Sequence, residues 1–193
     1  MYANTLYDGS IITVQGMNFK VSIIRDDDMD FPWEEHDGHG AVSEWTRRAK
    51  RPGEMTLCAA SGMRRYYDFQ GAVQLARKDG WNCAPYHWAW ATKGEQAHQS
   101  ALADFDYLRR YCTGDWEYVS VGVTLLDDSD ELMDYPETEY LGGVEYDPRD
   151  TSYVREIAEE LAERIIDRQA RLFAVIEPHE EIGSEPDVTQ VAA

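Results

Sequence analysis

The chain of 193 residues carries 18 Lys and Arg side chains against 37 Asp and Glu, a formal net charge of −19 at pH 7. Because such a surface repels polyanions, the charge argues against direct binding to nucleic acid or to an anionic lipid surface. Hydrophobic residues make up 43% and aromatic residues 12%, which is typical of a folded protein, and no run of about 18 apolar residues predicts a membrane span.

The first predicted element is a β-hairpin over residues 11–24. Its two runs, IITV and FKVSII, are rich in β-branched and aromatic residues and are joined across Gln15-Gly16, a pair typical of a tight turn. Acidic residues follow the second strand directly, so we expect them to form a surface loop that leaves the sheet at this point.

This loop is the first of two acidic blocks, with seven acids against the single base Arg25. Its acids, which we take as candidate partner-binding residues, are Asp26, Asp27, Asp28, Asp30, Glu34, Glu35 and Asp37. The block includes the stretch FPWEEHDGHG, in which His36 and His39 stand beside carboxylates, the ligand types that zinc or manganese accept. A two-histidine helical zinc site needs a different spacing, and Asp37-Gly38 breaks a helix. We therefore interpret the stretch as an acidic surface turn with two solvated histidines, and a metal site at His36 and His39 is the alternative.

The middle of the chain predicts a short helix within residues 40–49, then a second hairpin, then two helices. The hairpin strands are EMTLCAA and MRRYYDF, joined at Ser61-Gly62. Asp68 and Gly80 are typical N-terminal and C-terminal caps of a helix between them. Thr92 and Glu95 match a capping box that begins a second helix, which extends to about Cys112.

The C-terminal half predicts two more strands and a long helix. Residues 116–126 alternate apolar and polar side chains, and residues 138–146 form a shorter strand in which Gly142-Gly143 indicates a bulge or bend. Residues 151–172 have an apolar stripe at helical spacing, with glutamates opposite, so this helix is expected to pack on the sheet.

The second acidic block begins between these two strands and extends past the end of the second. Between Asp127 and Asp150 the sequence contains ten acidic residues and one basic residue, Arg149. The segment from Trp45 to Lys78 has the opposite composition, with eight basic residues and two acidic ones. Such segregated charge is typical of a protein with a directed electrostatic face. The candidate partner-binding acids of this second block are Asp127, Asp128, Asp130, Glu131, Asp134, Glu137 and Glu139.

The order of elements predicts an α+β fold, because strands arrive in antiparallel pairs and helices are grouped. We expect a single domain over residues 1–176, a mainly antiparallel sheet with about three helices packed on one face, and a flexible acidic tail over residues 177–193. The three cysteines are too few and too scattered for a disulfide framework. Their odd number, with no export signal visible, fits a reducing cytoplasm.

Other chemistry has weaker support in the sequence. Trp81, Trp88 and Trp90 form an aromatic cluster that is either an interface or a loop packed on the core. Cys83 with His87 is a candidate nucleophilic pair, and the clustered carboxylates are compatible with a metal-dependent nuclease. No phosphate-binding, dinucleotide-binding or serine-nucleophile motif occurs, and we expect no cofactor.

Three segments together resemble a known family. They are PWEEHDGHGAVSEWTRRAKRPGE, RRYYDFQGAVQLARKDGW and LGGVEYD with the following YVREIAEELAERI. These segments are similar to small acidic proteins encoded by tailed bacteriophages of Gram-negative hosts. That family has no established activity, so the resemblance supplies no functional residues. It implies a phage or prophage origin and residence in the host cytoplasm.

Charge and resemblance together lead to one functional hypothesis. The chain is expected to be a phage-encoded inhibitor of host defence, of the anti-CRISPR or anti-restriction type, that occupies a basic nucleic-acid-binding cleft by acidic DNA mimicry. Its partner would be a basic host protein rather than nucleic acid or a membrane. The alternatives are a metal-dependent enzyme or nuclease that uses His36 and His39, or an accessory phage protein whose acidity is incidental.

Overall fold

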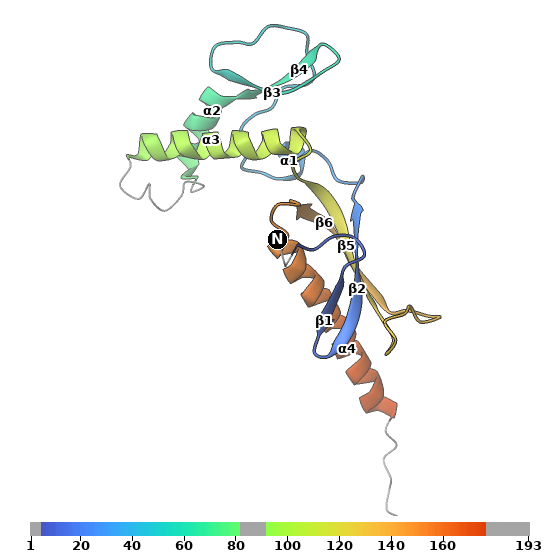
Figure 1. Cartoon of the computed structure of the whole chain (residues 1–193). Coiled ribbons are helices and arrows are strands. Elements are labelled where there is room, and N and C mark those ends of the chain that lie inside the picture. The colour runs from blue at the N-terminus through green and yellow to red at the C-terminus, as the bar shows by residue number, and fades with distance from the viewer. Residues whose placement is uncertain (1–4, 82–91, 177–193) are drawn as a thin grey trace, which may run out of the picture.

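The computed structural model describes residues 5–81 and 92–176, whose helices and strands form two packing units (Figure 1). The first unit comprises β1 (Ile11–Val14), β2 (Met17–Arg25), β5 (Glu117–Leu125), β6 (Thr138–Tyr146) and α4 (Ser152–Ile176). The second comprises β3 (Glu54–Ala60), β4 (Met63–Asp68), α2 (Phe69–Asp79) and α3 (Lys93–Cys112), and the short helix α1 (Pro32–Glu35) follows β2. The predicted α+β class with antiparallel pairing is confirmed.

The first unit is a four-stranded sheet in the order β1-β2-β5-β6, and all of its neighbours are antiparallel. Apolar residues alternate along β2 and β5, so Val21 and Val123, which pair across the two strands, are both fully buried. The predicted stripe of α4, which includes Ala158, Leu161 and Ile165, is buried in the same core. Apolar residues recur at every second position in the strands and at every third or fourth position in α4. Each element therefore has one apolar face, and these faces pack together in a single core.

The second unit has a smaller core around Tyr67 of β4, a side chain with no exposed surface. Tyr67 packs with Leu57 of β3 and with Phe105 and Leu108 of α3. Helices α2 and α3 pack on each other and on the hairpin β3–β4, whereas α4 packs on the four-stranded sheet. The helices are thus divided between two sheets.

The predicted turn and capping residues occupy their expected places. Both residues of the Gln15-Gly16 turn have positive φ, 50° and 84°, as a two-residue hairpin turn requires. The Asp68 side chain accepts a backbone N–H at the start of α2, and Gly80 ends this helix in the left-handed region with φ 71°. Thr92 and Glu95 form the predicted capping box of α3.

Residues 41–49 do not form the predicted short helix. They run beside β4 as an irregular strap, in which Val42 pairs with Tyr67 and Thr46 pairs with Arg64 in isolated bridges. The prediction failed because pairing with a neighbouring strand outweighs a weak local helix preference. The four-residue helix α1 was also not predicted.

An ion pair between Arg48 and Glu54 closes this strap. The two terminal nitrogens of Arg48 donate to the two carboxylate oxygens of Glu54 at 2.7 and 2.6 Å, and the Arg51 N–H donates to Glu54 at 2.8 Å. The Arg48 guanidinium also lies 4.7 Å from the centre of the Tyr66 ring. The hydrogen bonds from Arg48 lower the pKa of Glu54 from 4.5 to about 2.

Because of the ion pair between Arg48 and Glu54, we expect the fold to lose stability as the pH falls into the acid range. Because the folded-state pKa of Glu54 lies below its ordinary value, the pair stabilises the fold fully above pH 4.5 and progressively less as the pH falls towards 2. The difference in urea midpoint between the wild type and Glu54→Gln should therefore shrink between about pH 6 and pH 3. Glu44→Gln, which removes an exposed acid of the same strap, should give no such trend.

A disulfide joins Cys58 of β3 to Cys112 at the end of α3, a pairing that the sequence, with cysteines too few and too scattered for a disulfide framework, did not predict. Their Cα atoms lie 5.8 Å apart although the residues are 54 positions apart in sequence. The sequence could not reveal this proximity, because it arises only when α3 packs across β3. Cys83 lies outside the described residues.

Aromatic side chains fix the second unit on the end of the four-stranded sheet. Figure 1 shows α3 lying crosswise to α4 at the end of the sheet where β5 begins. The rings of Tyr107 and Tyr111 on α3 lie 4.6 and 5.0 Å from that of Trp116, measured between centroids. Trp116 donates from Nε1 to the Tyr107 carbonyl at 2.9 Å, and the Tyr107 hydroxyl donates to Glu145 of β6 at 2.6 Å. The two units are therefore connected by specific contacts rather than by chain alone.

Candidate binding surfaces

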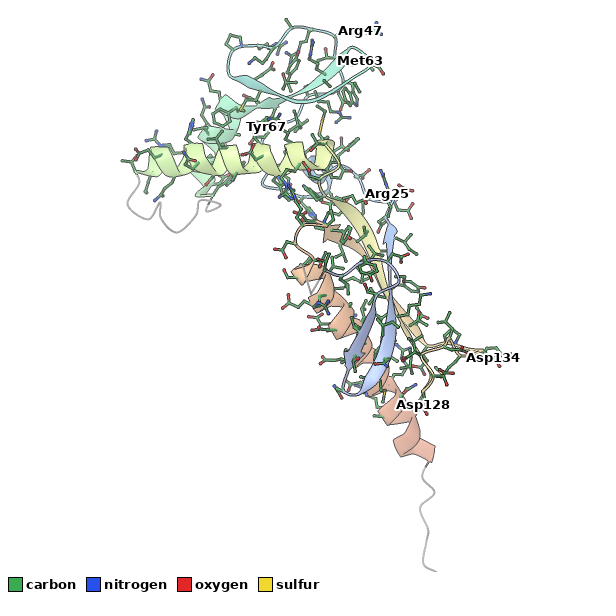
Figure 2. The ribbon with its side chains drawn as sticks, viewed as in Figure 1. Arg25, Arg47, Met63, Tyr67, Asp128 and Asp134 are labelled. Atoms are coloured by element: carbon green, nitrogen blue, oxygen red, sulfur yellow. A yellow bond between two sulfur atoms is a disulfide. The ribbon has the colours of Figure 1, made fainter. Side chains whose placement is uncertain are left out.

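The two acidic blocks lie at opposite ends of the four-stranded sheet. β2 ends at Arg25 beside the start of β5, so the junction acidic block (residues 26–37) leaves the sheet there. The distal acidic block (residues 127–139) begins where β5 ends, and Figure 2 shows Asp128 and Asp134 far from Arg25. A strand of nine residues, the length of β5, is about 30 Å long. The candidate acids thus form two separate groups, one at each end of the sheet, rather than one continuous surface.

Part of the junction acidic block serves the fold. The Oδ2 atom of Asp26 accepts from the Gly143 N–H at 2.9 Å and from the Ser120 hydroxyl at 3.2 Å. The hydrogen bond from Gly143 lowers the pKa of Asp26 below its usual value. Asp27 forms an exposed ion pair with Arg25 at 2.8 Å. Asp26 therefore braces the bend in β6 that the glycine pair predicted, and its carboxylate is already engaged.

Three acids of the distal block are engaged in a similar way. The Asp127 side chain accepts two backbone N–H groups of its own turn, both at 2.8 Å. Asp130 accepts from Asn18 of β2 at 2.6 Å, and Glu139 forms an ion pair with Arg168 of α4. These contacts brace the start of the loop and tie the block to β2 and α4.

The remaining candidates are mostly exposed carboxylates whose side chains form no hydrogen bond or ion pair within the described part of the chain. They are Asp28, Asp30, Glu34, Glu35 and Asp37 in the junction block, and Asp128, Glu131 and Asp134 in the distal block. Glu137 is half-buried, and one of its oxygens has no partner among the described residues. Tyr135, 93% exposed, stands among the distal acids. The distal end therefore offers free charge beside an aromatic ring, a residue type enriched where proteins bind each other.

The interpretation of His39 as a solvated surface residue is corrected by its contacts with α3. Its Nδ1 lies 2.5 Å from Oδ1 of Asp104, and its ring stacks on Tyr107 at a centroid distance of 5.6 Å. The other oxygen of Asp104 accepts from the Gly40 N–H at 2.8 Å and from the Tyr67 hydroxyl at 2.6 Å. Asp104 is only 7% exposed, so this buried network anchors the end of the acidic loop on α3.

The network separates the two histidines proposed as alternative metal ligands. His36 is exposed and its ring lies near Tyr118, with centroids 6.3 Å apart, whereas Nδ1 of His39 faces Asp104. Over residues 5–81 and 92–176, no group of three or more His, Cys, Asp and Glu side chains is arranged to hold a metal ion. His39 has a structural role in this arrangement.

Of the three aromatic interface candidates, only Trp81 lies within the described residues. Trp81 is half-buried and packs against the core of the second unit, and its carbonyl accepts from the Ser100 hydroxyl at 3.1 Å. Trp88 and Trp90 lie outside the described residues, as do Cys83 and His87, so their predicted roles stay predictions. The predicted tail, residues 177–193, lies outside them as well.

A cleft of about 820 Å³ lies at the junction of the two units. One wall is β3, and the other is formed by the C-terminal end of α3 and the start of β5. The end of β2 and the aromatic residues Phe31, Trp33 and Trp45 complete the lining. The volume falls within the range of small-molecule sites, about 300–1,000 Å³.

The cleft gathers positive charge in a protein whose net charge is strongly negative. Its basic residues are Arg25, Lys50, Arg65 and Arg109. Two acids also line it, Asp26 and Glu117. Asp26 is bound to β5 and β6, and Glu117 lies 3.8 Å from Arg25. The charge that remains uncompensated in the cleft is therefore positive.

Arg65 is the unusual member of this group because it is 5% exposed. Its guanidinium carbon lies 4.4, 5.2 and 5.4 Å from the ring centroids of Phe31, Trp33 and Trp45. No ion pair or hydrogen bond to this side chain is formed within the described residues, and its Nε is buried without a partner. Aromatic stacking offsets part of the cost of burying the cation, but the unpaired donor remains costly.

Sequence reasoning missed this site because it counted Arg65 only as part of a basic block. The signal that it overlooked is local: Arg64-Arg65-Tyr66-Tyr67 does not alternate polar and apolar residues, and in the structure Arg65, Tyr66 and Tyr67 are all buried. In a strand with one solvent-exposed face, buried and exposed side chains would alternate instead. Arg48 of the strap covers Tyr66, whose hydroxyl donates to the Arg48 carbonyl at 2.9 Å, and the strap also brings Trp45 to Arg65.

Comparison of the chain with protein-family models, with curated proteins and with solved structures gave no match. Within the described ranges, no helix combines the length and the apolar character needed to cross a membrane.

Proposed function

We propose that this protein acts by binding rather than by catalysis. Its distal acidic block enters a basic, nucleic-acid-binding cleft of another protein and takes the place of backbone phosphates. The observation that carries the proposal is the set of exposed carboxylates of Asp128, Glu131 and Asp134, which have no partner among the described residues. Asp128 and Glu131 lie on the turn that the Asp127 side chain braces. Carboxylates held at fixed positions attract a basic cleft and speed association.

A rigid base supports this proposal, since mobile acids would lose side-chain and loop entropy on binding. β5 is paired on both sides, with β2 and with β6. Asp127 closes the distal turn, and the contact of Asp130 with Asn18 ties it to β2. The loop therefore presents its charges with little ordering left to be done.

The resemblance to acidic phage proteins narrows the partner that we propose. A phage protein in the host cytoplasm meets defence complexes that bind nucleic acid, such as CRISPR effectors and restriction enzymes. These complexes present basic clefts shaped for phosphate backbones. The proposal is therefore an inhibitor of such a complex that competes with its nucleic acid.

The proposal predicts that binding depends on distal charge and on salt. A host partner would be captured at about 50 mM salt and identified by mass spectrometry, and its affinity would then be measured with the purified proteins. Reversal of Asp128, Glu131 and Asp134 to lysine should weaken binding at least about tenfold. Raising the salt to about 500 mM should weaken the wild-type complex strongly.

The matched control changes the net charge by the same amount as the distal triple variant, but at positions outside both acidic blocks. Glu44, Glu156 and Glu163 are exposed acids outside both blocks, and reversing all three should leave the affinity within about threefold of the wild type. Equal losses from the two triple variants would mean that only net charge matters. Salt-independent binding, or a complex that still holds its nucleic acid, would contradict mimicry.

A further inference from the structure

We infer that the cleft at the junction of the two units binds a small molecule in which a planar ring carries an anionic group, a nucleoside monophosphate being representative. The inference does not depend on the proposed partner binding, because the distal acidic block lies at the other end of β5. It rests on a buried cation that has no counter-ion among residues 5–81 and 92–176, on aromatic walls and on a volume of about 820 Å³.

The buried guanidinium of Arg65 defines the anion subsite. Buried arginines are ordinarily paired with carboxylates or with several acceptors, because an unpaired buried charge is unfavourable. No described side chain supplies such an acceptor to Arg65, which lines the cleft and is 5% exposed. A phosphate or carboxylate group from a ligand would supply it, and a planar guanidinium suits such groups especially well.

Two exposed cations provide an electrostatic path into the cleft. Lys50 and Arg109 both line it and neither forms an ion pair within the described residues. A protein with a net charge of −19 repels anions from most directions. A local cluster of positive charge at the cleft therefore makes this the favourable place for a small anion to approach.

The aromatic lining defines the ring subsite. Trp45 is 37% exposed while its ring faces Arg65 at 5.4 Å, so a ligand anion at Arg65 would place an attached ring beside the indole. Tyr111 and Trp116 line the opposite wall, where they hold the two units together. Planar rings stack on such surfaces with little dependence on their identity. A polymer of nucleotides is disfavoured because the rest of the protein repels its additional phosphates.

Calorimetric titration of the full chain tests this inference. The probes are AMP, GMP, CMP and UMP, with indole-3-acetate as a ring that carries a carboxylate. At least one of them should bind saturably with a Kd below about 1 mM. Adenosine, which lacks the anion, and inorganic phosphate, which lacks the ring, should each bind at least about tenfold more weakly than the best probe. Arg65→Met should weaken that probe by about ten- to a hundredfold.

Three further variants separate a lost site from a lost fold. Lys50→Met and Trp45→Leu alter exposed side chains of the cleft and should each weaken the best probe by about threefold or more. Arg64→Met removes the neighbouring, exposed arginine and should leave binding unchanged. The inference is overturned if no probe saturates, if Lys50→Met and Trp45→Leu both bind like the wild type, or if single-stranded DNA binds more tightly than any probe.

Discussion

Replacement of Asp104 by alanine is expected to lower the free energy of unfolding by about 3 kcal/mol. The carboxylate receives the Gly40 N–H and the Tyr67 hydroxyl and contacts His39, all in a nearly buried position. Its removal takes an acceptor from the Gly40 N–H, from His39 and from the Tyr67 hydroxyl, which keeps its contact with the Ala101 carbonyl at 3.3 Å, and loss of a buried polar partner is unfavourable. Urea unfolding at neutral pH, followed by circular dichroism, measures the change.

Asp106→Ala is the matched control, because Asp106 is an exposed acid two positions further along α3. Its substitution should change stability by no more than about 0.5 kcal/mol. Hydrogen exchange at the Gly40 amide gives a second measurement, since Asp104→Ala should accelerate exchange there more than in the core of the four-stranded sheet. Stability of Asp104→Ala equal to that of the control would show that the network contributes nothing.

Reduction of the disulfide between Cys58 and Cys112 is expected to lower the free energy of unfolding by up to about 4 kcal/mol. The bond closes a loop defined by a sequence separation of 54 residues, and a loop of this length restricts the unfolded chain substantially. Denaturant unfolding with and without dithiothreitol measures the effect. Because thiols prevail in reducing compartments and disulfides in oxidising ones, we expect the chain to be more stable in an oxidising compartment.

Two comparisons make this result specific. The double variant Cys58→Ser/Cys112→Ser should have the stability of the reduced wild type and should not respond to dithiothreitol. Cys83→Ser retains both bonded cysteines and should respond as the wild type does. If the double variant responded to reductant, the effect would have to arise elsewhere in the chain.

Local patterns predicted most of the elements because their determinants are local. The turn at Gln15-Gly16 and the capping residues Asp68, Gly80 and Thr92 lie where the sequence placed them. Each acts within three or four residues of its own position, so no knowledge of tertiary structure is needed. The strap at residues 41–49 was mistaken for a helix because its structure depends on pairing with β4.

The candidate surfaces were predicted less completely, because their members meet only in the folded chain. Sequence identified both acidic blocks, but not that β5 separates them or that Asp26 braces β6. His39 lies 65 positions from Asp104, a separation at which no spacing rule applies. Arg65 likewise meets Phe31 and Trp45 only when the strap and the acidic loop pack against β4.

The separation of the acidic blocks makes the sheet a molecular ruler. The two ends are held about 30 Å apart by β5, a strand of nine residues that is paired on both sides. A partner with two basic patches at this spacing would engage both ends at once, and its second contact would form at high effective concentration. A partner with a single basic patch, or with two patches closer together, would contact only one of the acidic blocks and would bind more weakly. Length, as well as charge, would therefore select the protein to which this chain binds.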